Sequence, residues 1–343
     1  MKTPKIYIIA GESSGDFLGA EILKKLKKMN CTISIIGGEL MEMQCGASLF
    51  DISEISVGGI TEIIPHIYRI KQLINKAIQD ILSKDIDVLL TIDSPDFNFR
   101  IAKAVKKHNK KIRLIHLVAP TVWAWREKRA KKIASIYHQL LTLFDFEPAY
   151  FEKYGLKTTF VGHPFAQCFH KTSCKKEELI LLLPGSRSQE IKTLLPIFLK
   201  AIQNRAEQII IPTLPSQQNL VRSIIGERKI LIVSSEEQKN ELFRVAKFAI
   251  VASGTATLQL ALSHCPMIVC YKLSNITYLI LKKLVHLKHI SLVNILLNRN
   301  AVPELIQNDC TPSNISACIT STCFAKQLSA FDELPKHITN QDV

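Results

Sequence analysis

Short apolar runs alternate with amphipathic helical patterns along nearly the whole chain. Such alternation, with short connections, is typical of parallel sheets that are covered by helices on both faces. We therefore expect an α/β protein built on doubly wound parallel sheets. The predicted strands are residues 6–10, 32–36, 88–92, 113–118, 139–143 and 158–161 in the first half, and 179–183, 208–212, 230–233, 248–252 and 267–271 in the second.

The alternation is interrupted once, near the middle of the chain. Gly162-His163-Pro164 ends the first set of elements, and residues 170–178 are polar without an apolar period. A chain of 343 residues is long for one domain and natural for two. We predict an N-terminal domain over 1–165 and a C-terminal domain over 178–343, with 166–177 as the linker. The polar stretch 328–343 fits either a terminal helix or a tail.

Three predicted strands run directly into a turn of small residues that opens a helix. These turns are 11–16, 184–187 and 253–257. Each directs unpaired backbone N–H groups and the positive end of a helix at one spot, which favours phosphate binding. Ligands of doubly wound sheets lie at the carboxyl ends of the strands. One turn in the first half and two in the second indicate two domains that share an anionic ligand, and favour a nucleotide diphosphate.

The two turns of the second half carry polar candidates for that ligand. Ser186 and Gln189 have the spacing of a capping box, and Arg187 is placed to fork onto a diphosphate. Gly254 and Thr255 offer backbone N–H groups, and Thr255 adds a hydroxyl group. Gln259 lies one helical turn further on the same face, within reach of a ribose.

Asp93 follows the predicted strand 88–92. We expect Pro95 to hold Ser94 extended, so that Asp93 is presented at the strand tip as a candidate general base. Asp96 has a structural alternative as the N-cap of the next helix. Asp85 and Asp87 form a D-x-D pair at the opposite end of the strand, where solvated loop carboxylates are the better interpretation.

Composition narrows the class of partner. Lys and Arg exceed Asp and Glu by 44 − 30 = 14, which favours nucleic acid, a phosphorylated substrate or an acidic membrane surface. The nine cysteines have no C-x-x-C spacing, so we expect reduced thiols and no structural metal. We also expect no cofactor. No apolar run approaches the roughly 18 residues of a membrane-spanning helix. We therefore expect a cytoplasmic protein.

Two segments combine apolar and basic residues. An isoleucine stripe within 57–71 is typical of core, but its glycines, Pro65 and the basic residues that follow also suit an interfacial segment. Tryptophans beside basic residues in 123–132 suit a lipid headgroup, a phosphorylated sugar or single-stranded nucleic acid, and a solvated helix face is the simpler alternative. The candidate lipid-facing residues are Ile60, Ile63, Ile64, Ile67, Trp123, Trp125, Arg126 and Arg129.

Eight segments in order along the chain form a recognisable set. They are AGESSGDFLGA (10–20), VGGITEIIPHI (57–67), IDSPDFN (92–98), PTVWAWREKRAKKI (120–133), FVGHPF (160–165), LLPGSR (182–187), ASGTATLQLAL (252–262) and SLVNILLNRNAVPELIQ (291–307). Together they resemble the lipid-A-disaccharide synthase family of inverting GT-B glycosyltransferases.

The resemblance implies two Rossmann-like domains that face a cleft. It also implies a reaction of UDP-2,3-diacylglucosamine with 2,3-diacylglucosamine 1-phosphate, giving the β-1′,6-linked lipid A disaccharide 1-phosphate and UDP. Such an enzyme acts at the inner face of the inner membrane and uses no nucleic acid. A homodimer is left open.

The resemblance also implies roles for single residues. Asp93 matches the family's base, and Arg187 matches its arginine near the diphosphate. Gln259 replaces the usual Glu, and its amide can still accept one hydrogen bond and donate others, so the consequence for UDP binding is left open. Val293 replaces a Pro. Glu12 and Ser14 match the family's glycine turn near the sugar. The positions that match its UDP site are Gly185, Ser186, Ser253, Gly254, Thr255 and Gln259. Asn294, Glu304 and Gln307 match the polar positions that follow the second nucleotide turn.

Two other classes remain as alternatives. One is another GT-B enzyme, which adds N-acetylglucosamine to a lipid-linked precursor. The other is a non-catalytic, basic membrane- or RNA-binding protein with Rossmann-like domains, which explains the charge but not Asp93 or the three turns.

Overall fold

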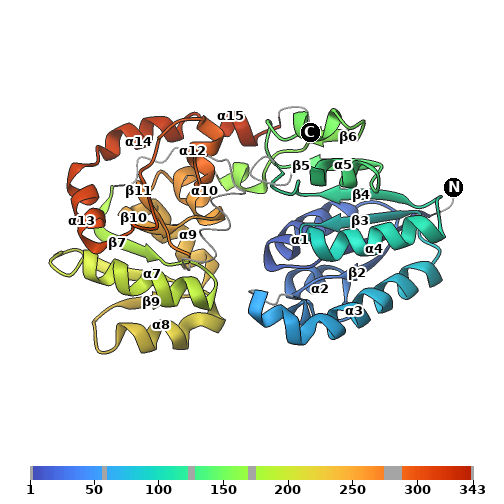
Figure 1. Cartoon of the computed structure of the whole chain (residues 1–343), viewed down its shortest axis with the longest axis horizontal. Helices are drawn as coiled ribbons and strands as arrows, with labels where there is room; N and C mark the ends of the chain where they lie inside the picture. Colours follow the sequence, from blue (N-terminus) through green and yellow to red (C-terminus); the bar gives the residue numbers. More distant parts are fainter. Residues whose placement is uncertain (1–2, 56–59, 123–127, 169–174, 274–287, 341–343) are drawn as a thin grey trace. The chain divides into compact units, whose positions relative to one another are not determined.

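The computed structural model describes all residues except 1–2, 56–59, 123–127, 169–174, 274–287 and 341–343, and it leaves out the side chains of 13, 53, 60–67 and 167–168. The described chain forms two compact units. The first comprises Met1–His163 together with Asn340, and the second comprises Pro164–Thr339. Each unit is a parallel six-stranded sheet flanked by helices (Figure 1).

The first unit has the strand order β2-β1-β3-β4-β5-β6, and every neighbouring pair is parallel. Its central strand β1 is buried from Tyr7 to Ala10, as the apolar run predicts. The strands are β1 (Lys5–Ala10), β2 (Thr32–Ile36), β3 (Val88–Ile92), β4 (Arg113–Leu117), β5 (Gln139–Thr142) and β6 (Lys157–Phe160). The α-helices are α1 (Ser13–Leu26), α2 (Glu39–Cys45), α3 (Ile60–Ser83), α4 (Pro95–His108), α5 (Lys128–Ala134) and α6 (Ala149–Glu152).

The second unit repeats this architecture with the order β12-β11-β10-β7-β8-β9. The strands are β7 (Glu177–Leu183), β8 (Gln208–Pro212), β9 (Leu231–Val233), β10 (Ala246–Ala252), β11 (Met267–Tyr271) and β12 (Glu304–Ile306). The α-helices are α7 (Ser188–Ala201), α8 (Gln218–Ile225), α9 (Glu236–Val245), α10 (Thr255–Leu262), α12 (Leu292–Leu297), α13 (Pro312–Ser321), α14 (Phe324–Phe331) and α15 (Pro335–Ile338).

Each predicted strand is confirmed within a residue or two, and the α/β class with doubly wound sheets is confirmed with them. The sequence pattern missed β12, because only three residues pair there and all three are half-buried. The polar C-terminal stretch contains α15, whose Ile338 is buried, and the Asn340 side chain donates a hydrogen bond to the Phe160 carbonyl oxygen.

Each sheet reverses its strand order at one place. In the first unit the chain passes from β1 to β2 on one side and then to β3 on the other. In the second it passes from β7 through β8 and β9, and then returns to β10 on the opposite side of β7. Ligands of open α/β sheets bind at the carboxyl ends of the strands beside such a reversal. A site is therefore expected at the carboxyl ends of β1 and β3 in the first unit, and of β7 and β10 in the second.

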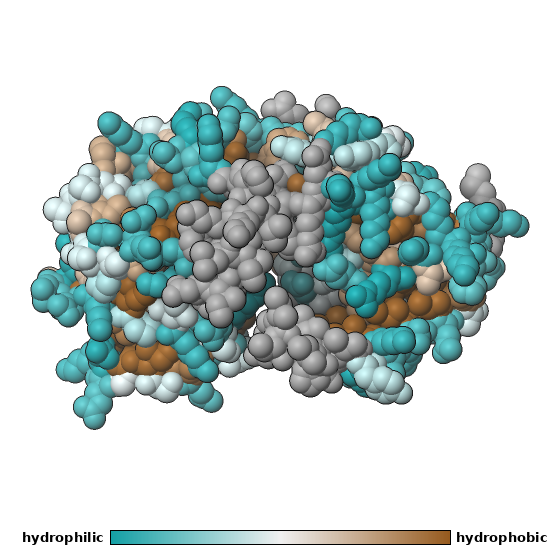
Figure 2. Space-filling model, viewed as in Figure 1, coloured by the Kyte–Doolittle hydropathy of each residue, from teal (hydrophilic) through white to brown (hydrophobic). Residues whose placement is uncertain are grey.

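Most protruding residues on the face shown in Figure 2 are hydrophilic, with hydrophobic residues between them. Among the described residues, no helix is both long enough and apolar enough to cross a bilayer.

Candidate active site

The carboxylate of Asp93 lies at the carboxyl ends of β1 and β3 in the first unit. The Ser14 hydroxyl, from the start of α1, donates a hydrogen bond of 2.9 Å to Asp93 Oδ2. The backbone N–H of Ser94 donates one of 2.8 Å to Asp93 Oδ1. Both carboxylate oxygens are held in place, while the residue stays half-exposed. A fixed carboxylate with lone pairs to spare is suited to accept a proton.

The backbone at this edge is strained. Asp93 and Ser94 have φ angles of 51° and 40°, in the left-handed region. The expectation that Pro95 holds Ser94 extended is therefore wrong. The buried Asn98 side chain, reaching back from α4, donates hydrogen bonds to the carbonyl oxygens of Ile92 and Asp93 and turns the chain sharply. Left-handed residues other than Gly cost about 1–3 kcal/mol each and cluster at functional sites.

Val118, which directly follows the neighbouring strand β4, also has a positive φ of 76°. This angle is a genuine outlier for a β-branched residue. Two adjacent strand ends, β3 and β4, thus carry backbone strain at the same edge of the sheet.

The glycine turn after β1 packs directly on the Asp93 loop. A Cβ atom on Gly11 would lie 2.6 Å from Ser94 Oγ, so no side chain fits there. Ser94 Oγ in turn donates a hydrogen bond of 3.2 Å to Glu12 Oε1. The structure therefore brings together Glu12, Ser14 and Asp93, which the sequence places far apart.

The two aspartates nearest to this site in the sequence motifs, Asp16 and Asp96, have structural contacts of their own. Asp16 is buried and accepts hydrogen bonds from the backbone N–H groups of Gly38, Leu40 and Met41, which caps the start of α2. The proposed N-cap role of Asp96 is wrong, because Ser94 occupies that position. Asp96 instead pairs with Arg129 Nη2 at 2.6 Å.

A buried polar network links β3 and β4 to Tyr137, which lies just before β5. Thr91 Oγ1 is 2.7 Å from His116 Nδ1 and 2.9 Å from the Tyr137 hydroxyl oxygen. Burial lowers the pKa of His116 from 6.5 to about 3. Burial also lowers the pKa of His163, which stacks on Phe144, to about 4. Both histidines are therefore neutral in the folded protein at ordinary pH.

These histidines predict acid lability of the first unit. The unfolded chain binds a proton at each below about pH 6.5, whereas the folded chain does not, so the free energy of unfolding falls as the pH falls from 6.5 toward 4. In that pH range, each histidine changes the free energy of unfolding by about 1.4 kcal/mol per pH unit. His116→Asn is expected to remove one such slope in urea unfolding followed by tryptophan fluorescence, because both tryptophans lie in the first half of the sequence. A slope in His116→Asn equal to that of the wild type would contradict the prediction.

In the second unit, the turn after β7 is built around Gly185, whose φ of 112° disfavours any other residue. The helix α7 begins after Arg187, and the Glu190 carboxylate accepts the Arg187 backbone N–H at 3.4 Å. The capping-box prediction on Ser186 and Gln189 is thus wrong by one residue. The shift leaves the Ser186 side chain exposed beside the turn.

The Arg187 side chain is 67% exposed, and its Nη1 lies 3.4 Å from Glu190 Oε1. Burial and the Glu190 carboxylate raise the pKa of Tyr271, and Arg187 acts in the opposite direction. The three side chains therefore lie close enough to feel each other's charge. Most of the Arg187 donors face solvent and suit a bidentate contact with a phosphate.

The turn after β10 lies on the other side of the same strand reversal. Ser253 Oγ donates a hydrogen bond of 2.7 Å to the Ile290 carbonyl oxygen, which ties the turn to that loop. Gly254 and Thr255 are exposed at the start of α10. The half-buried Gln259 makes no side-chain hydrogen bond to the described residues. The first N–H groups of α10 have no partner within the helix, so this turn offers donors to an anion.

Asn294, Glu304 and Gln307 use their polar atoms internally. Glu304 accepts the backbone N–H groups of Ile290 and Ser291 at 3.0 and 2.9 Å, and Asn294 Nδ2 at 2.8 Å. The Gln307 amide exchanges two hydrogen bonds with the backbone of Leu273. These side chains fix the chain at 273 and 290–291. Their predicted contact with substrate stays a prediction.

The remaining departure from the family pattern, Val293, is buried in α12. Ser291 caps this helix by accepting the Asn294 backbone N–H, so Val293 does not cost the helix its start. Of the proposed lipid-facing residues, Arg129 is described. Trp123, Trp125 and Arg126 lie outside the described residues, as do the side chains of Ile60, Ile63, Ile64 and Ile67.

A family model described as lipid-A-disaccharide synthetase matches residues 6–330. The lipid-A-disaccharide synthase of Rickettsia bellii (strain OSU 85-389) is 40% identical over 332 residues, covering 91% of this chain and 87% of that protein. Among solved structures, a co-structure of S. aureus MnaA with UDP has a TM-score of 0.65 at 13% identity, covering 97% of this chain and 95% of that one. MurG of Acinetobacter baumannii has a TM-score of 0.57 at 13% identity, covering 96% and 95%.

The structural neighbours agree with the GT-B architecture of two Rossmann-like units, and the sequence matches extend over nearly the whole chain. The strained Asp93 loop and the turns after β7 and β10 lie within the matched residues. The chain belongs to the lipid-A-disaccharide synthase family, glycosyltransferases of lipid A biosynthesis.

Proposed function

We propose that the chain condenses UDP-2,3-diacylglucosamine with 2,3-diacylglucosamine 1-phosphate. The acceptor 6-hydroxyl oxygen attacks C1 of the donor sugar, the bond from C1 to the UDP oxygen breaks, and UDP leaves with the bonding electrons. The hydroxyl proton passes to a carboxylate. The products are the β-1′,6-linked disaccharide 1-phosphate and UDP, with inversion at C1.

The observation that carries this proposal is the Asp93 carboxylate, held by Ser14 and Ser94 at a strained strand end. Removal of the hydroxyl proton during attack needs one positioned base. Glu12 and Ser14, which belong to the same cluster, are the residues proposed to contact the sugar. The energetic cost of the left-handed backbone supports a functional rather than a structural reason for this geometry.

UDP is assigned to the second unit. Ser186, Arg187 and the N–H groups of Gly254 and Thr255 flank one strand reversal, which is where nucleotides bind in doubly wound folds. Gln259 is proposed to reach the ribose. The co-structure of MnaA with UDP, which has the same fold, supports a UDP-linked donor.

The acylated substrates also imply a place of action. We assign the protein to the cytoplasmic side of the inner membrane as a peripheral protein, with the apolar stripe of α3 and the basic region near Arg129 toward the lipid. The net charge of +14 supports an anionic surface. A homodimer remains compatible with this assignment.

The test is a reaction with both diacylated sugars in neutral detergent micelles. Release of UDP together with formation of the disaccharide is expected. A parallel reaction replaces the donor with UDP-N-acetylglucosamine and the acceptor with a lipid-linked peptidoglycan precursor, because MurG shares the fold. Turnover with the second pair alone would replace the proposal by the alternative transferase. Binding of lipid without UDP release from either pair would favour the non-catalytic class.

A further inference from the structure

The surface between α4 and α5 of the first unit is hollowed and strongly basic. The hollow has a volume of about 830 Å³. It contains five cationic side chains and one carboxylate, a net charge of +4. Asp96, Phe99, Arg100 and Lys103 come from α4, and Lys128, Arg129 and Lys132 come from α5.

Arg129 forms the fixed centre of this basic hollow. Its guanidinium pairs with Asp96 at 2.6 Å, and its side chain is only 16% exposed. The guanidinium carbon lies 5.6 Å from the centre of the Phe99 ring. Phe99 is itself buried against His116 and Tyr137. The floor of the hollow is therefore apolar, which strengthens electrostatic attraction at this position relative to open water.

The other four cations have no acidic partner in the described part of the chain. Lys128 and Lys132 are four residues apart on α5, and Arg100 and Lys103 are three apart on α4. Like charges at these spacings share a helix face and repel each other. A bound anion would relieve this repulsion.

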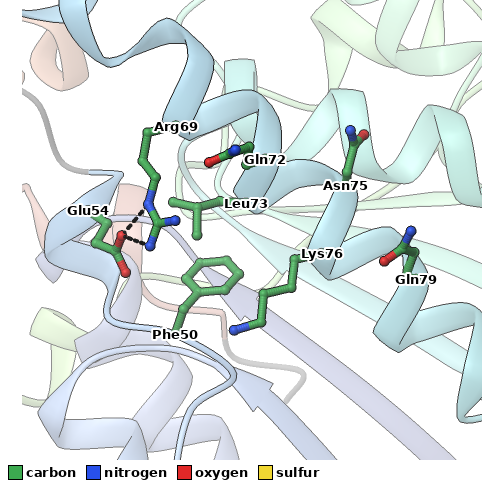
Figure 3. Close-up of a pocket in the computed structure, with 8 residues that line it drawn as sticks. All are labelled: Phe50, Glu54, Arg69, Gln72, Leu73, Asn75, Lys76 and Gln79. Atoms are coloured by element: carbon green, nitrogen blue, oxygen red, sulfur yellow. Dashed lines mark hydrogen bonds and ion pairs between the residues drawn. The ribbon is translucent and has the colours of Figure 1, made fainter.

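In a second hollow of the same unit, the cationic side chains bond to other groups of the protein. This hollow has a volume of about 420 Å³ and lies beside α3 (Figure 3). There, Glu54 accepts hydrogen bonds from the Arg69 guanidinium, and Lys76 Nζ donates to the Leu49 carbonyl oxygen at 3.2 Å. The protein itself satisfies these cations. The second hollow thus carries a net charge of +1, against +4 in the basic hollow.

One wall of the basic hollow begins, along the chain, just after the candidate base. Asp96, on its wall, is three residues from Asp93 and in the first turn of the helix that follows it. In the proposed acceptor, the 6-hydroxyl and the 1-phosphate flank the ring oxygen, the first through C6 and C5 and the second through C1. A sugar that presents its 6-hydroxyl to Asp93 must therefore carry its phosphate close by.

We propose that the basic hollow binds the phosphate of the phosphorylated acceptor sugar. Arg100, Lys103, Lys128 and Lys132 supply the charge, and Arg129 stays tied to Asp96. A phosphate monoester carries close to two negative charges and three acceptor oxygens, which suits a fork-shaped guanidinium and several ammonium groups. The identity of the sugar in this inference rests on the proposed function. The binding of an anion in the hollow does not depend on it.

The test replaces the four unpaired cations by glutamine (Arg100→Gln, Lys103→Gln, Lys128→Gln, Lys132→Gln). The acceptor KM in neutral micelles is expected to rise about 10- to 100-fold, because charge-assisted hydrogen bonds are lost, while the donor KM stays within about twofold. The matched control changes four exposed lysines of the same region that do not line the hollow (Lys107→Gln, Lys110→Gln, Lys111→Gln, Lys131→Gln). Equal acceptor KM values in the two variants would overturn the proposal.

Direct binding separates this proposal from the reaction itself. Calorimetry is expected to show that wild type binds glucosamine 1-phosphate more tightly than glucosamine, and that the four-residue variant loses this difference. That result would stand even if no turnover were observed, and its absence would overturn the proposal even if turnover were normal. If the variant loses binding to phosphatidylglycerol vesicles but keeps the wild-type acceptor KM, the hollow serves the membrane and the proposal is wrong. The double variants on α4 or α5 alone replace the full variant if it fails to fold.

Discussion

Asp93→Asn is expected to lower kcat by roughly 10²- to 10⁴-fold, because a positioned base contributes about that factor. The substitution preserves shape: the amide oxygen still accepts the Ser94 N–H, and the amide nitrogen donates to Ser14 Oγ in place of the bond now made to Oδ2. Asn also tolerates the left-handed backbone of this position. The variant therefore removes the proton acceptor without disturbing the loop. The measurement is UDP release under saturating donor and acceptor.

Asp87→Asn is the matched control for this experiment. Asp87 directly precedes β3, Asp93 directly follows it, and the Asp87 side chain accepts the backbone N–H of Lys5, a bond that Asn retains. Its kcat should stay within about twofold of wild type, since it lies at the far end of the strand. UDP affinity, measured by calorimetry, should be unchanged in both variants. Wild-type kcat in Asp93→Asn would exclude this carboxylate as the base.

The sheets were predictable from sequence because their strands are buried on both faces and read as continuous apolar runs. Tyr7–Ala10 and Phe248–Ala252, for example, are almost fully buried. The apolar pattern does not predict short or irregular segments. It missed β12, whose half-buried residues give no run.

The polar residues at the strand ends were predictable in position but not in role. The sequence places Asp93 and Ser14 at neighbouring strand ends, and they do meet. It gives no sign that Asn98 turns the Asp93 loop, because one polar residue on a helix does not reveal which carbonyl groups it contacts. The same holds for Asn294, whose amide oxygen accepts the backbone N–H groups of Ala301 and Val302. Such roles depend on tertiary contacts.

Arg187→Ala is expected to lower kcat/KM by roughly 10²- to 10³-fold, the usual loss when one donor to a developing negative charge is removed. As UDP departs, negative charge grows on its diphosphate, and the exposed Arg187 fork at the start of α7 suits that group. Arg187→Lys should recover part of the rate, because it keeps the charge but loses the bidentate geometry. The assay is UDP release at subsaturating donor.

This loss should not come from unfolding. The backbone N–H of residue 187 remains to bond Glu190, and the side-chain contact that is lost is long and exposed, so stability should change by less than about 0.5 kcal/mol. Arg222→Ala, which removes an exposed arginine from α8 in the same unit, should leave both stability and kcat/KM near wild type. If the two alanine variants turn over equally fast, Arg187 does not contact the leaving group, and stabilisation of UDP must come from the backbone donors at Gly254 and Thr255.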